Sequence, residues 1–143
     1  MIRVAPALVA FGLATAQVHA DTDFCQTLSA LQATAAVPED GDVVFAFTDD
    51  TGALATCRRV LELGGARSLA CNWAFAYRSD AAQAAFAALV SQVTSCRGAP
   101  LATDTPVNHP DSYDLLTFTD GISVALKDKA ALQETHVILR VQG

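Results

Sequence analysis

Basic residues are scarce in this chain: 9 Lys and Arg stand against 15 Asp and Glu, a formal net charge of −6. Proteins that bind nucleic acid or an anionic membrane surface need basic patches to neutralise phosphate charge. The acidic balance therefore argues against both as partners. It is ordinary for a secreted soluble protein.

Sequence signatures of catalysis are also missing. The chain contains no Gly-x-Ser-x-Gly elbow, no His-Glu-x-x-His pair and no Gly-Lys-Ser/Thr phosphate loop. Its 4 cysteines include no Cys-x-x-Cys pair, the spacing typical of redox enzymes and zinc sites. We therefore expect no catalytic residues, no metal and no cofactor.

The N-terminus has the pattern of a cleavable signal peptide. Arg3 is followed by an uncharged, largely apolar segment, and Val18-His19-Ala20 ends it with a small residue. This segment is too short to span a bilayer, which takes about 20 apolar residues, and no later stretch is long enough either. The sequence predicts a signal peptide over 1–20 and a single domain over 21–143, periplasmic or secreted and free of the membrane after cleavage.

Two segments, 22–36 and 80–96, have the periodicity of amphipathic helices, with apolar residues every three or four positions. Short apolar or alternating segments between turn residues predict strands at about 43–47, 54–62, 67–77, 112–118, 122–127 and 135–142. The order helix, three strands, helix, three strands suggests a pseudo-repeat of two halves. We expect an α+β fold with a mostly antiparallel sheet and both helices on one face, because each apolar helix stripe needs an apolar layer.

An even number of cysteines behind a signal peptide predicts two disulfide bonds. A tight turn around Gly64 would place Cys57 and Cys71 opposite each other on adjacent strands. If a pseudo-twofold axis relates the halves, the helices run antiparallel and Cys25 lies beside Cys96. These arguments favour Cys25–Cys96 and Cys57–Cys71 over the other two connectivities.

The segment 67–77 alternates cleanly between two faces. Trp73 lies on the apolar side, together with Leu69, Cys71, Phe75 and Tyr77. We expect Trp73 to be buried under the helices.

A further prediction concerns the face of the sheet away from the helices. Asp120-Gly121 is typical of a two-residue type I′ hairpin turn, whose register places Leu116 and Phe118 on the opposite face from Val124 and Leu126. The residues of the 135–142 strand that share this second face are Ile138, His136 and Arg140. With two helices available, we expect the face to lie open, although the 97–111 loop could instead cover it.

Exposed apolar residues rimmed by polar ones mark interaction surfaces. The sequence therefore predicts a partner-binding surface formed by Leu116, Phe118, Ile138, His136 and Arg140.

An alternative hypothesis depends on His109, which lies in the loop Asn108-His109-Pro110-Asp111-Ser112. Histidine near carboxylates can act as an acid, a base or a metal ligand, which would make the chain a small periplasmic hydrolase or a ligand- or metal-binding protein. A loop of this composition is more often a simple turn entering a strand. The sequence favours a non-catalytic periplasmic or secreted module that binds a protein partner or self-associates.

Overall fold

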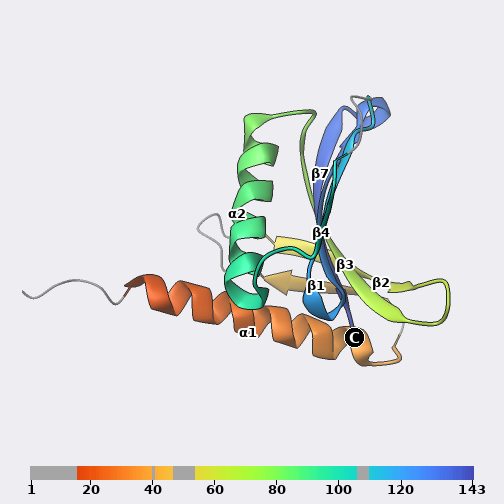
Figure 1. Ribbon diagram of the computed structural model, residues 1–143. Coiled ribbons are helices and arrows are strands. Elements are labelled where there is room, and N and C mark those ends of the chain that lie inside the picture. Colours follow the sequence, from red (N-terminus) through yellow and green to blue (C-terminus); the bar gives the residue numbers. More distant parts are fainter. Residues whose placement is uncertain (1–15, 40, 47–53, 106–109) are drawn as a thin grey trace, which may run out of the picture.

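The computed structural model describes residues 16–39, 41–46, 54–105 and 110–143. Two helices pack on one face of a seven-stranded antiparallel sheet (Figure 1). The predicted α+β class, with both helices on one face and two disulfides, is confirmed. The helices are α1 (Ala16–Ala36) and α2 (Asp80–Arg97), and the strands are β1 (Asp42–Ala46), β2 (Leu54–Leu61), β3 (Arg67–Ala76), β4 (Ala102–Asp104), β5 (Tyr113–Thr117), β6 (Ile122–Lys129) and β7 (Glu134–Gln142).

The strand order β1-β2-β3-β7-β6-β5-β4 shows how the two halves of the chain meet. β3 from the first half pairs with β7 from the second, and each half continues outward from this central pair. The predicted pseudo-repeat is matched only roughly, since the second half has a fourth strand. That strand, β4, lies inside the segment predicted as a loop and pairs with β5 at the sheet edge.

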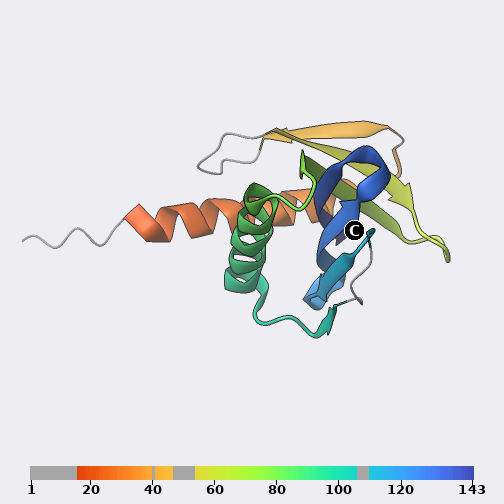
Figure 2. The same cartoon turned by 90° about the horizontal axis from the view of Figure 1, so that it is seen from above.

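The core lies between the helices and the sheet. On α1 the buried residues Phe24, Leu28, Leu31 and Ala35 recur every three or four positions, as an amphipathic helix requires. α2 begins at Ser79, whose side chain accepts a hydrogen bond from the Ala82 amide. Figure 2 shows both helices lying between β1 on one side and β4 on the other, so the sheet curves around them.

Both predicted disulfides are present: Cys25–Cys96 joins the helices and Cys57–Cys71 joins β2 to β3. The antiparallel helix orientation predicted for the first bond is wrong. The helices do not run antiparallel; they cross steeply, with the C-terminal end of α2 over the middle of α1 (Figures 1 and 2). The crossing point itself brings the two cysteines together, with their Cα atoms 5.4 Å apart.

The predicted register of the β5–β6 hairpin is wrong by one residue. The Phe118 amide donates to the Ile122 carbonyl oxygen at 2.8 Å, so three residues, Thr119–Gly121, form the loop. A shift of one residue moves every side chain of a strand to the other face of the sheet. Phe118 is only 2% exposed and belongs to the core, and Leu116 packs against that core.

The same shift moves Tyr113 and Leu115 away from the helices, because they pair with Lys127 and Ala125. Trp73 lies on the predicted side of β3 and packs against the core, although it is only partly buried.

α1 begins at Ala16 and therefore continues across the predicted cleavage site after Ala20. Among the described residues, no helix is both long enough and apolar enough to cross a membrane.

Candidate functional site

The face of the sheet opposite α1 and α2 is called the helix-free face here. Of the five predicted contact residues, His136, Ile138 and Arg140 lie on it, whereas Leu116 and Phe118 lie on the opposite, helix-covered face. Cross-strand pairing places these residues on the helix-free face: Thr56 and Arg58 of β2, Ala70, Asn72 and Ala74 of β3, His136, Ile138 and Arg140 of β7, Ser123, Ala125, Lys127 and Lys129 of β6, and Tyr113 and Leu115 of β5.

A short apolar row crosses the middle of this face. Ile138 pairs with Ala125 of β6, which pairs in turn with Leu115 of β5. Ala125 is only 4% exposed because the larger side chains stand on either side of it. On the other side of Ile138 the row ends in the exposed, polar Asn72. The helix-free face therefore has an apolar centre with polar surroundings.

His136 sits beside this row and is 7% exposed. Its Nε2 lies 2.8 Å from Glu134 Oε2, and its Nδ1 lies 2.9 Å from Asn72 Nδ2. A neutral ring that donates from Nε2 to the carboxylate and accepts at Nδ1 from the amide satisfies both contacts. A general base needs a free ring nitrogen within reach of the proton that it abstracts. Because both nitrogens are occupied, this arrangement holds the imidazole in place and does not favour proton transfer.

Basic residues lie beside the apolar row on the helix-free face, and acidic residues lie toward its edges. On the strands β2, β3, β7 and β6, one acidic residue, Glu134, stands against four basic ones: Arg58, Arg140, Lys127 and Lys129. The edge strand β4 adds the exposed Asp104, which pairs with Leu115 on the same face. Arg140 Nη1 also forms an ion pair with Glu62 Oε1 at 3.1 Å. The sequence pattern alone did not reveal this gathering, since the four residues lie on three strands and net charge hides their common face.

A buried polar cluster around Asp128 holds the start of α2 against the end of the sheet. Its carboxylate accepts hydrogen bonds from Arg78 Nε at 2.8 Å, Ser112 Oγ at 3.0 Å and Thr135 Oγ1 at 2.7 Å. Burial by itself raises the pKa of the Asp128 carboxyl, but the bonds from Thr135, Arg78 and Ser112 together hold this pKa below its usual value. With every partner internal, the cluster is structural.

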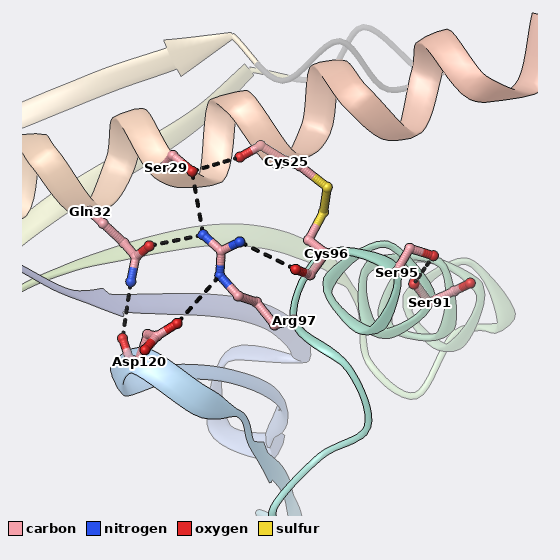
Figure 3. The surroundings of a disulfide bond; sticks show 8 residues. All are labelled: Cys25, Ser29, Gln32, Ser91, Ser95, Cys96, Arg97 and Asp120. Carbon is pink, nitrogen blue, oxygen red and sulfur yellow. Dashed lines mark hydrogen bonds and ion pairs between the residues drawn. A yellow bond between two sulfur atoms is a disulfide. The ribbon is translucent and has the colours of Figure 1, made fainter.

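A second junction, absent from the sequence-based expectations, surrounds the Cys25–Cys96 disulfide (Figure 3). The Arg97 guanidinium donates to Gln32 Oε1 at 3.0 Å, Ser29 Oγ at 3.4 Å and the Cys96 carbonyl at 3.3 Å. Its Nε lies 3.9 Å from Asp120 Oδ2, and Gln32 Nε2 donates to the Asp120 carbonyl. This network ties both helices to the β5–β6 loop and so fixes the sheet on the helices.

His109, the centre of the alternative hypothesis, lies outside the described residues. The neighbouring Asp111 and Ser112 are described, and both make internal hydrogen bonds, to the Ala130 amide and to Asp128. In the part of the chain that is placed, no group of three or more His, Cys, Asp or Glu side chains could hold a metal ion.

Comparison with known proteins finds no matching family model, no matching curated protein and no matching solved structure. A function is therefore proposed from the contacts of the described residues alone.

Proposed function

We propose that this chain is a non-catalytic module of the periplasm or the extracellular space that binds a protein partner through its helix-free face. The observation that carries the proposal is the apolar row of Ile138, Ala125 and Leu115, which no helix covers and which basic residues border. Apolar groups rimmed by polar ones are the common pattern of contact surfaces.

The basic residues Arg140 and Lys127 beside the apolar row favour an acidic partner over a second copy of the chain. A twofold axis through the apolar row would bring the same patch of two copies together, so Arg140 and Lys127 of one copy would lie close to those of the other. Like charges brought together in an interface cost free energy. An acidic partner surface would instead be attracted, which raises both the association rate and the affinity.

The two disulfides, Cys25–Cys96 and Cys57–Cys71, support a location in the periplasm or the extracellular space. Disulfides form and persist in oxidising compartments such as the periplasm and the extracellular space. A hydrolase that uses His109 remains the alternative, but none of the described contacts supports it.

The proposal is tested with two matched variants, in each of which glutamate replaces an exposed alanine. Ala74 lies on the helix-free face next to His136, and Ala88 lies on α2; both are exposed. Ala74→Glu introduces a bulky acid into the face, whereas Ala88→Glu makes the same change elsewhere. The tagged proteins are purified from the cells that secrete them, and the amounts of co-purified protein are compared.

We expect Ala74→Glu to reduce the recovered partner by about tenfold or more, which corresponds to about 1.4 kcal/mol, and Ala88→Glu to leave it unchanged. Equal recovery with both variants would refute the helix-free face as the contact surface. If the unmodified protein sediments in a concentration-dependent way and Ala74→Glu abolishes this behaviour, the partner is a second copy of the chain and not an acidic protein.

A further inference from the structure

A cavity of about 630 Å³ lies at one end of the helix-free face, where β5, β6 and the turn η2 (Ala130–Leu132) meet. Lys127 and Lys129 of β6 contribute to both the face and the cavity. The residues that line the cavity are Asp111, Tyr113, Lys127, Asp128, Lys129, Ala131 and Leu132.

The two acidic residues of the lining are already engaged within the protein. Asp128 accepts hydrogen bonds from Arg78, Ser112 and Thr135, as described above. Asp111 accepts one from the Ala130 amide at 2.9 Å through Oδ1. Asp128 is thus turned into the fold, whereas Asp111 holds the Ala130 end of the turn and stays exposed at the cavity.

The two lysines are not neutralised in the same way. Among the described residues, no carboxylate lies within ion-pair distance of Lys127 or Lys129. Glu134, opposite Lys129 in the sheet, is turned to His136 instead. Residues two apart on a strand point to the same side, so the two ammonium groups can act on one ligand. The Lys127 ammonium lies 5.8 Å from the centre of the Tyr113 ring, which leaves it on the cavity side of β5.

Two apolar residues of η2, Ala131 and Leu132, also line the cavity. Leu132 is 58% exposed at the tip of η2, next to Ala131. The turn is held by Gln133, whose amide and Nε2 both donate to the Ala130 carbonyl, at 3.0 and 2.6 Å. Because the turn is held in place, the exposed Leu132 side chain offers a fixed apolar surface for contact with a ligand.

We propose that this cavity binds a carboxylate-bearing segment of the partner, in which Asp or Glu side chains flank an apolar residue. The carboxylates lie against Lys127 and Lys129, and the apolar side chain packs on Leu132. The identity of the ligand as a partner segment rests on the proposed function, because the same β6 strand forms both the cavity and the helix-free face.

The test is a titration followed by the backbone amide signals in nuclear magnetic resonance spectra of the secreted protein. The probe is a synthetic peptide, Glu-Glu-Leu-Glu-Glu with both ends blocked, and inorganic phosphate is titrated separately. We expect saturable shifts of the Tyr113, Lys127, Lys129 and Leu132 amides with the peptide.

The variant Lys127→Gln/Lys129→Gln should weaken peptide binding by about tenfold, because two solvent-exposed ion pairs together contribute about that factor. The control Arg67→Gln/Gln83→Glu lowers the net charge by the same two units away from the cavity and should change the affinity by less than about twofold. Equal weakening by both variants would show that net charge, and no particular site, attracts the peptide. An absence of saturable shifts at the cavity overturns the inference, and tighter binding of phosphate overturns its assignment to carboxylates.

The peptide titration tests the cavity, and the partner recovery with Ala74→Glu tests the proposed function, so either can fail without the other. If Ala74→Glu releases the partner while the peptide fails to bind, the helix-free face stands and the cavity site falls. If the peptide binds at the cavity while Ala74→Glu has no effect on the partner, the cavity site stands and the proposed contact face falls.

Discussion

The Phe118 amide donates a hydrogen bond to the Ile122 carbonyl oxygen at 2.8 Å across the end of the β5–β6 hairpin. This pairing turns Phe118 and Leu116 toward the helices and Leu115 toward the helix-free face. The register therefore decides which residues of β5 lie in the core and which lie on the helix-free face.

Substitution of Phe118 and Leu115 tests this register. We expect Phe118→Ala to lower the free energy of unfolding by about 3–5 kcal/mol, the usual cost of removing a large aromatic side chain from a packed core. Leu115→Ala should cost less than about 1 kcal/mol, because Leu115 is partly exposed. Urea unfolding of both variants gives the comparison, and the reverse ranking would restore the two-residue turn.

Both helices and six of the seven strands could be predicted because they depend on local periodicity, whereas the short edge strand β4 (Ala102–Asp104) has no such pattern. The Cys57–Cys71 bond followed from the tight turn near Gly64, whose positive φ of 100° suits glycine. The hairpin register could not be predicted, since Asp120-Gly121 fits both a two-residue and a three-residue loop. The contacts that hold this loop come from Gln32, 88 positions away, and from Arg97 on α2.

The residues of the helix-free face were also predicted only in part. Alternation along one strand placed His136, Ile138 and Arg140 together on one face. Leu116 and Phe118 were assigned to that face through the wrong turn. Arg78 is 50 positions from Asp128, so the buried Asp128 cluster has no local sequence pattern that could reveal it.

The two disulfides should contribute unequally to stability. Cys25–Cys96 closes a separation of 71 positions and Cys57–Cys71 one of 14. On the loop-entropy account, we expect Cys25→Ala/Cys96→Ala to cost about 4 kcal/mol and Cys57→Ala/Cys71→Ala about 3 kcal/mol. Thermal unfolding of the two double variants measures both. A larger loss from the short loop would show that packing around the buried Cys57 and Cys71 outweighs chain entropy.

Arg97 should not be replaceable by lysine. Its guanidinium reaches Gln32, Ser29 and the Cys96 carbonyl at once, and a single ammonium cannot reproduce that geometry. We expect Arg97→Lys to cost about 1–2 kcal/mol in unfolding free energy, whereas Arg67→Lys serves as a control with little change. Equal stability of the two variants would mean that only the charge of Arg97 matters.

Asp128 should govern part of the acid sensitivity of the fold. Its pKa is lower in the folded protein than in the unfolded chain, so its contribution to stability is present above the unfolded pKa of about 3.9. That contribution is lost as the pH falls through the lowered folded pKa. We expect Asp128→Asn to lower the free energy of unfolding by about 2–3 kcal/mol at pH 7. Below about pH 4, the free energy of unfolding of this variant should fall less steeply with decreasing pH than that of the unmodified protein. Parallel stability curves for both proteins over this range would contradict this role.

The most direct test of the helix-free face as the contact surface is site-specific photocrosslinking in the cells that produce the protein. A photoreactive phenylalanine analogue replaces Ala74 on that face in one variant and Ala88 on α2 in another. We expect a discrete crosslinked species from position 74, of a mass other than twice that of the chain, and none from position 88. Crosslinking from position 88 without crosslinking from position 74 would contradict this expectation.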